Sequence, residues 1–209
     1  MKAEVKGLYA ITPDIADTAE LLARVEAALT GGASLLQYRN KTAGAALRLV
    51  QARALLALCW DYHVPLIIND HLELTLALDA HGLHLGGEDG SIAEARERLG
   101  PGKVLGVSCY GRIENALAAA GAGATYVAFG GFFPSKVKPG TARTPVDLLS
   151  EAKRELKLPV VAIGGITLDN APALIAAGAD SVAVISALFE AQDVELAARR
   201  FKSLFRKQP

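Results

Sequence analysis

Residues 37–41, Gln-Tyr-Arg-Asn-Lys, follow two leucines and join a strand-like pattern to charges that could bind an anion. Side chains alternate along a strand, so Gln37, Arg39 and Lys41 are expected on one face. The opposite face would then carry Leu36, Tyr38 and Asn40. Two cations on the inner face of a strand are costly when they stay dry and unpaired. The pattern therefore predicts an anionic ligand, and the alternative is that both charges are solvated in a loop beyond the strand.

Two acidic positions follow the next two strand-like runs. Asp70 comes directly after residues 65–69, and Asp89 comes shortly after residues 82–86. In neighbouring strand–helix units both could reach one point, and hard oxygen ligands suit Mg²⁺, which bridges substrate phosphates. The sequence thus predicts a magnesium site at Asp70 and Asp89, with Glu88 as a weaker third candidate. The alternative is that each aspartate caps the helix that follows it.

Two later strand-like runs end in residues that could expose backbone N–H groups to a phosphate. Gly164-Gly165 precedes one predicted helix, and Ile185-Ser186 follows the last apolar run. Backbone N–H groups at the start of a helix bind anions. The alternative is a tight turn, in which glycine is common. Neither a P-loop nor a dinucleotide-binding glycine fingerprint occurs in the chain.

Short apolar runs alternate with Ala- and Leu-rich runs along the chain. The runs expected as strands start near Leu8, Leu35, Pro65, Gly82, Val104, Tyr126, Pro159 and Ser181. Those expected as helices span residues 19–29, 43–62, 91–99, 112–120, 145–156, 168–177 and 194–205, on the basis of helical spacing of their apolar residues. Asp17, Ser91, Thr144 and Asp193 are the expected N-terminal caps.

This alternation is typical of a (β/α)8 TIM barrel, an α/β fold in which the chemistry lies at the carboxyl ends of the strands. We expect a single barrel domain over residues 1–209. A doubly wound open sheet is the alternative, but it usually has fewer strands and a topological switch. The longest predicted loop, residues 130–143, is rich in Lys, Pro, Ser and Gly. Long loops in compact domains are often functional, so this one is a candidate lid.

The composition excludes several classes of protein. Lys and Arg total 22, as do Asp and Glu, so no global charge favours nucleic acid or an anionic membrane. Cys59 and Cys109 lack the spacing of a disulfide scaffold or zinc site. The four histidines lack a zinc-site spacing, although His84 could face the barrel interior. No signal-peptide core or membrane-length apolar run is present, so we expect a cytoplasmic enzyme with no nucleic-acid or membrane partner.

The strand ends as a set resemble the thiamine-phosphate synthase family over nearly the whole chain. The matching stretches are residues 37–41, Asn69-Asp70, 84–86 with Glu88-Asp89, 106–108, 133–135 with Lys138, 162–166 and 184–186. The resemblance implies condensation of a hydroxymethylpyrimidine diphosphate with a hydroxyethylthiazole phosphate, or its carboxylated form. The products would be thiamine phosphate and diphosphate, and the two phosphorylated small molecules would be the partners.

The resemblance also implies roles for individual residues. Asp70 and Asp89 would bind Mg²⁺ on the diphosphate. The pyrimidine diphosphate would be bound by Gln37, Arg39, Lys41, Asn69 and Lys138, with Ser108 near the pyrimidine. Tyr38 and Asn40 lie in the same matching stretch and are assigned to substrate binding as well. The thiazole phosphate would lie along Ser135, Lys136, Val137, Gly165, Ile185 and Ser186. Arg39, Lys41, Ser108 and Lys138 are the expected catalytic residues, in a dissociative path without a general base or covalent nucleophile.

Four positions depart from the family pattern. Ser135 and Val137 stand where threonine is usual, Gly87 where glutamine is usual, and His81 where aspartate is common. The closest rival function is the thiazole tautomerase of the same fold, for which we expect a histidine where this chain has Gly130-Gly131. Other rivals are a non-catalytic sensor of thiazole phosphate or thiamine phosphate, and an unrelated phosphosugar isomerase. The sequence leaves the oligomeric state and the accepted thiazole tautomer open.

Overall fold

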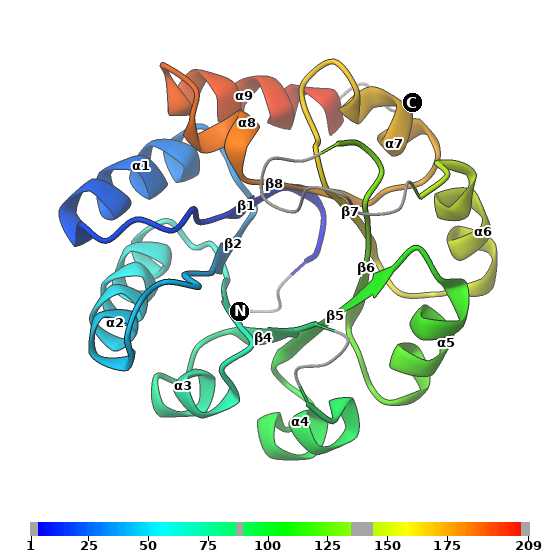
Figure 1. The fold of residues 1–209 in the computed structure, drawn as a ribbon, viewed down its shortest axis with the longest axis horizontal. Coiled ribbons are helices and arrows are strands. Elements are labelled where there is room, and N and C mark those ends of the chain that lie inside the picture. The colour runs from blue at the N-terminus through cyan, green and yellow to red at the C-terminus, as the bar shows by residue number, and fades with distance from the viewer. Residues whose placement is uncertain (1–3, 87–89, 135–143, 206–209) are drawn as a thin grey trace.

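The computed structural model describes residues 4–86, 90–134 and 144–205. Within them, the strands form a closed parallel barrel in chain order, and Figure 1 looks down it with the helices outside. The strands are β1 (Gly7–Ile11), β2 (Leu35–Tyr38), β3 (Leu66–Asn69), β4 (Gly82–Leu85), β5 (Val104–Tyr110), β6 (Tyr126–Gly130), β7 (Val160–Ile163) and β8 (Ser181–Val184). Pairing of β1 with β8 closes the barrel, which confirms the predicted fold and excludes an open sheet.

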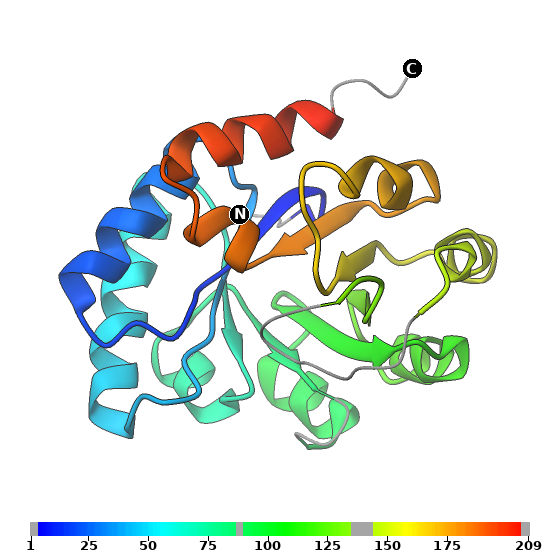
Figure 2. The ribbon, with the colours of Figure 1, turned by 45° about the horizontal axis from the view of Figure 1, so that its top comes forward.

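The helices follow the strands in alternation. They are α1 (Thr18–Thr30), α2 (Ala45–Asp61), α3 (Leu72–Ala77), α4 (Ile92–Leu99), α5 (Ile113–Gly121), α6 (Asp147–Glu155), α7 (Ala171–Ala176), α8 (Ser186–Phe189) and α9 (Val194–Leu204). The sequence prediction missed α3 and α8, which are too short to show a helical period. Figure 2 shows α9, in red, lying against α1, in blue, a contact that covers the joint between the first and last strands.

Two apolar layers result from the alternation of side chains along the strands. Leu35 belongs to a cluster inside the barrel, whereas Leu36 and Tyr38 belong to the larger cluster between the strands and the helices. Gln37 lies on the inner side, where it contacts Tyr9. The predicted separation of faces along β2 is therefore confirmed.

Side-chain caps fix the starts of several helices. Asp17 accepts a hydrogen bond from the Glu20 N–H, and Asp193 accepts one from the Leu196 N–H. Ser91 caps α4 in the same way, so these three predicted caps are confirmed. The prediction for Thr144 is wrong. Its hydroxyl donates to the Gly130 carbonyl at 2.5 Å, and α6 begins further along the chain.

Gly106 provides space inside the barrel for an aromatic ring. A Cβ at this position would lie 2.0 Å from Cζ and 2.2 Å from Oη of Tyr126. Tyr126 is fully buried, so its ring has no free volume into which it could move. The glycine on β5 thus allows a tyrosine on β6 to cross the barrel interior.

We expect Gly106→Ala to lower the free energy of unfolding by about 1–3 kcal/mol or more, because the added methyl group overpacks the interior. Urea denaturation would measure the change. Gly102→Ala is the matched control, because a Cβ at Gly102 meets nothing within 4 Å. Equal stabilities of the two variants would show that the barrel interior can relax around the new methyl group.

Candidate active site

A cavity of about 620 Å³ opens at the carboxyl ends of the barrel strands. The predicted site residues that line it are Gln37, Arg39, Lys41, Asn69, Asp70, Ser108, Gly165, Ile185 and Ser186. They come from the ends of five different strands, the arrangement in which barrels of this type place their reactive groups. Asp89, Ser135, Lys136, Val137 and Lys138 lie outside the described residues, as do Gly87 and Glu88.

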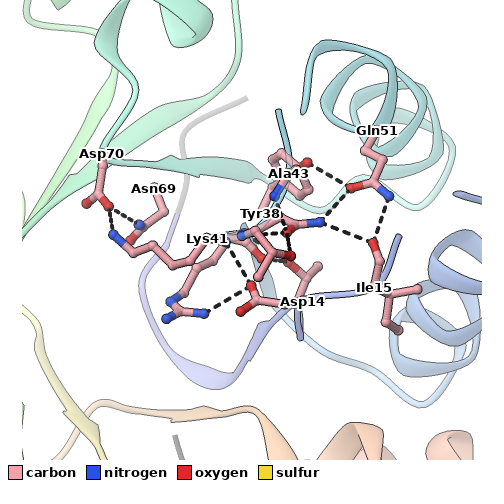
Figure 3. A network of polar contacts seen from close by, with 12 residues as sticks. Asp14, Ile15, Tyr38, Lys41, Ala43, Gln51, Asn69 and Asp70 are labelled. Carbon is pink, nitrogen blue, oxygen red and sulfur yellow. Dashed lines mark hydrogen bonds and ion pairs between the residues drawn. The ribbon is translucent and has the colours of Figure 1, made fainter. Parts of the chain in front are cut away.

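One end of the cavity carries charged side chains in contact with each other. Lys41 forms an ion pair with Asp70, and Asn69 donates from Nδ2 to the same carboxylate at 2.6 Å. Figure 3 shows the Lys41 side chain reaching toward Asn69 and Asp70. Asp70 adopts a left-handed backbone conformation, with φ of 63°, and its N–H donates to the His84 carbonyl at 2.9 Å. The turn that follows β3 thus presents a carboxylate to the cavity instead of capping α3.

A second aspartate fixes the loop that carries the two cations. Oδ1 of Asp14 accepts from the Lys41 N–H at 2.8 Å and from the Arg39 guanidinium at 3.3 Å. The side chain of Arg39 is 17 % exposed. Its backbone N–H donates to the Thr12 hydroxyl at 2.8 Å, and that hydroxyl donates to the Arg39 carbonyl. The end of β1 therefore positions the cations at the end of β2.

Tyr38 and Asn40 do not line the cavity. The Tyr38 hydroxyl donates to Oε1 of Gln51 on α2 at 2.8 Å, and Nδ2 of Asn40 donates to the same oxygen at 3.1 Å. Gln51 is fully buried and donates from Nε2 to the Ile15 carbonyl at 2.9 Å. These bonds join the loops after β1 and β2 to α2, as Figure 3 shows. The structure therefore places Tyr38 and Asn40 where they support the loop and do not face the cavity.

Replacing Gln51 with leucine should destabilise the protein by about 1–3 kcal/mol, because it leaves buried polar groups without their partner. The Tyr38 hydroxyl loses its acceptor, Oε1 of Gln51 at 2.8 Å, and the Ile15 carbonyl loses a donor. Thermal or urea unfolding would measure the effect. Tyr38→Phe removes one bond of the same network and should cost less. A Gln51→Leu protein as stable as the parent would contradict the assigned role.

The other end of the cavity is formed by the backbone of two loops. Gly164 and Gly165 have φ of 104° and 64°, and a Cβ at Gly165 would lie 2.4 Å from the Pro134 carbonyl oxygen. Asn170 stabilises the loop by donating to the Gly165 carbonyl at 3.0 Å. Among the described residues, none accepts a hydrogen bond from the N–H of Gly165 or Ser186. Backbone N–H groups of loops and helix starts at a cavity wall can bind an anion.

A histidine supports the serine on the cavity wall. Nε2 of His84 lies 2.9 Å from the Ser108 hydroxyl, and Nδ1 lies 2.8 Å from the hydroxyl of the buried Tyr126. This confirms that His84 faces the barrel interior. The departure at His81 does not touch the cavity, because His81 precedes β4 and its Nδ1 accepts from the Leu66 N–H at 3.1 Å.

Within residues 4–86, 90–134 and 144–205, no group of three or more His, Cys, Asp and Glu side chains could together hold a metal ion. The described part of the chain also has no helix with the length and apolar character that crossing a membrane requires. Asp70 is nevertheless a good oxygen donor for a hard cation. Its side chain is 13 % exposed, lines the cavity and already attracts the Lys41 ammonium group.

Comparison with known proteins places the chain in one family. Residues 8–188 match the family model described as thiamine monophosphate synthase. A thiamine-phosphate synthase from Nitrosomonas eutropha is 54 % identical over 204 residues, covering 98 % of this chain and 96 % of the relative. One from Janthinobacterium sp. is 55 % identical over 207 residues, covering 99 % of this chain and all of the relative.

A solved structure agrees with the sequence comparison. Thiamine phosphate pyrophosphorylase from Pyrococcus furiosus superposes with a TM-score of 0.87 at 34 % identity, covering 96 % of each chain. The fold, the residues that meet in the cavity and these relatives point to the same conclusion. The chain is a transferase that belongs to the thiamine-phosphate synthase family.

Proposed function

We propose that the chain joins hydroxymethylpyrimidine diphosphate to hydroxyethylthiazole phosphate, or its carboxylated form, in this cavity. The C–O bond to diphosphate breaks with its electron pair leaving on oxygen. The thiazole nitrogen then supplies the pair for the new C–N bond, which gives thiamine phosphate. The carboxylated form must also lose its carboxylate as CO₂ to give the same product. The observation that carries the proposal is a single cavity of about 620 Å³ with charged side chains at one end and backbone donors at the other.

The charged end suits the diphosphate. Arg39 and Lys41 supply positive charge, and a preorganised positive charge stabilises the negative charge that develops on a departing group. Arg39 also offers a planar fork of donors that can bind two phosphate oxygens. Asn69 lines the same end of the cavity and orients the Asp70 carboxylate. Lys138 is proposed to add a further cation, on the basis of the family pattern alone.

Asp70, with Asp89, would hold the Mg²⁺ that the family pattern implies. The position of Asp70 in the cavity fits this role, since its carboxylate is a hard oxygen ligand beside the proposed diphosphate. When bound, the ion would neutralise charge on the leaving diphosphate. Lys41 then has two partners in turn, because its ammonium group pairs with Asp70 here and can pair with phosphate oxygens of the substrate.

The backbone end suits the thiazole phosphate. The N–H groups of Gly165 and Ser186 are the proposed hydrogen-bond donors to this phosphate, and Ile185 lines the cavity beside them. Ser135, Lys136 and Val137 are proposed to extend this site. Gln37 and Ser108 also line the cavity, and they are proposed to contact the pyrimidine. Tyr38 and Asn40 would act through the loop that they support.

A dissociative path requires neither a covalent nucleophile nor a general base. Both cysteines are buried, and burial raises the pKa of Cys59 and of Cys109 to about 12. Each thiol is therefore protonated at neutral pH and cannot act as a thiolate. The carbocation must be kept from water, and the proposed lid is the loop after β6. The cytoplasmic location expected from the sequence stays a prediction.

The proposal is tested by mixing the protein with Mg²⁺, the pyrimidine diphosphate and the thiazole phosphate, and by omitting each component in turn. We expect diphosphate and thiamine phosphate to form only when all are present. Isomerisation of a thiazole phosphate without diphosphate release would assign the chain to the tautomerase reaction. Binding of thiazole phosphate or thiamine phosphate without any turnover would indicate a sensor.

A further inference from the structure

A chain of hydrogen bonds crosses the barrel interior and meets the cavity at both ends. Nε2 of Gln37 donates to the Tyr9 hydroxyl at 3.0 Å, and that hydroxyl lies 2.9 Å from the Tyr126 hydroxyl. Tyr126 lies 2.8 Å from Nδ1 of His84, and Nε2 of His84 lies 2.9 Å from the Ser108 hydroxyl. Gln37 and Ser108 line the cavity, whereas the two tyrosines are buried below it.

The barrel register brings these side chains together. His84 on β4 pairs with Gly106 on β5, and Gly106 pairs with Tyr126 on β6, so the three residues lie in one row. Because Gly106 has no side chain, the rings of His84 and Tyr126 meet across β5, with centroids 5.6 Å apart and planes 23° apart. The rings of Tyr9 and Tyr126 pack edge to face, with their centroids 6.0 Å apart. The contact is therefore built into the fold.

Counting protons gives the chain of bonds a direction. Burial raises the pKa of both Tyr9 and Tyr126, so each hydroxyl keeps its single proton at neutral pH. Since Tyr9 accepts from Gln37, its own proton can go only to Tyr126 within the network. Tyr126 must then donate to Nδ1 of His84, which has to be the unprotonated nitrogen. The imidazole proton therefore sits on Nε2 and is donated to Ser108.

A reversed network would be incomplete with the Gln37 amide as it stands. If Nδ1 of His84 carried a proton, Tyr126 would receive it and donate in turn to Tyr9. Tyr9 would then face two donors, from Gln37 and Tyr126, and its own proton would have no acceptor in the network. An imidazolium also leaves the Tyr9 proton without an acceptor in the network, because both of its nitrogens donate. Within this network of described residues, the neutral Nε2–H imidazole is the form that satisfies every hydrogen bond.

We propose that His84 is a positioning residue, held by the two tyrosines as the neutral Nε2–H tautomer, which makes Ser108 a hydrogen-bond donor to the substrate. Because Ser108 already accepts from His84, its own proton is directed to another acceptor, and the hydroxyl lines the cavity. The substrate group beside Ser108 is then a hydrogen-bond acceptor, such as a pyrimidine ring nitrogen. This last step rests on the proposed function, whereas the tautomer does not.

The tautomer is tested in the free protein by NMR after ¹⁵N labelling of histidine. The His84 signals are identified by their loss in His84→Gln. We expect a spectrum at neutral pH in which Nδ1 is unprotonated and Nε2 carries the proton. A protonated Nδ1 would overturn the inference. Because no substrate is present, failure of the synthase reaction would leave this result standing, and a wrong tautomer would leave the synthase reaction standing.

Kinetics test whether the tautomer matters for the substrate. His84→Leu should lower kcat/KM for the pyrimidine diphosphate by about tenfold, the equivalent of one hydrogen bond, and leave the KM for thiazole phosphate unchanged. His84→Gln should restore most of the loss, because its amide can accept from Tyr126 and donate to Ser108. His63→Gln, at an exposed position in the turn after α2, is the control. Equal rates for His84→Leu and the parent, or a loss in both KM values, would overturn the positioning role.

Discussion

Asp70→Asn is expected to abolish most of the turnover while the fold survives, with a loss of roughly 100- to 1,000-fold in kcat. The change removes one negative charge and almost no volume. Asparagine tolerates the left-handed conformation that Asp70 adopts, with φ of 63°, so the backbone is not strained. The loss follows because the variant lacks the anionic oxygen proposed to bind Mg²⁺ and the charge that pairs with Lys41.

Asp79→Asn is the matched control. Asp79 also has a left-handed backbone, with φ of 51°, and pairs with a lysine, Lys103. It precedes β4, at the opposite end of the barrel from the cavity, and its side chain is 91 % exposed. Turnover should be measured over a range of Mg²⁺ concentrations, with circular dichroism to verify the fold. A folded Asp70→Asn protein with the rate of the control would refute the metal assignment.

The second large effect is expected for Arg39→Gln, which should lower kcat/KM for the pyrimidine diphosphate by roughly 10- to 100-fold. The guanidinium is partly buried, lines the cavity and is oriented by Asp14. A hydrogen bond to a charged group is stronger than a neutral one, and glutamine cannot replace the charge or the bidentate fork. The KM for thiazole phosphate should change little, because the donors proposed for that phosphate are backbone N–H groups, which the substitution leaves in place.

Arg98→Gln is the control for Arg39. Arg98 is a surface residue of α4 that binds both carboxylate oxygens of Glu73, at 2.5 and 2.9 Å. Exposed ion pairs contribute little to stability, so its loss should leave both substrates unaffected. If Arg39→Gln instead raised the KM for thiazole phosphate alone, the two ends of the cavity would have been assigned the wrong way round.

The barrel and one face of β2 could be predicted from the sequence, because both depend on short-range repeats in the spacing of apolar and polar residues. Alternation along residues 35–41 is a property of any strand, and it placed Gln37 inside and Tyr38 outside correctly. The short helices α3 and α8 could not be found in this way, since neither completes enough turns to show a period. Thr144 was mistaken for a cap because a hydroxyl that bonds a distant carbonyl looks the same in sequence.

The supporting residues of the site were missed for a different reason. Gln51 contacts Ile15 across 36 residues of sequence, and Asp14 contacts Lys41 across 27. Such pairings depend on how the loops after β1 and β2 pack on each other and on α2, which no local sequence pattern shows. Asp14 could have been found by reading the end of β1 as the other strand ends were read. Gln51 left no comparable signal, since a glutamine in a helix is usually a solvated surface residue.

We propose that the two phosphate-binding ends of the cavity are occupied together. The most direct measurement is calorimetric binding of thiazole phosphate to the protein with and without saturating Mg²⁺ and diphosphate. We expect diphosphate to leave thiazole-phosphate binding intact and Asp70→Asn to weaken only diphosphate binding. Displacement of thiazole phosphate by diphosphate would show that both compete for one site, which would contradict a cavity with two separate phosphate-binding ends.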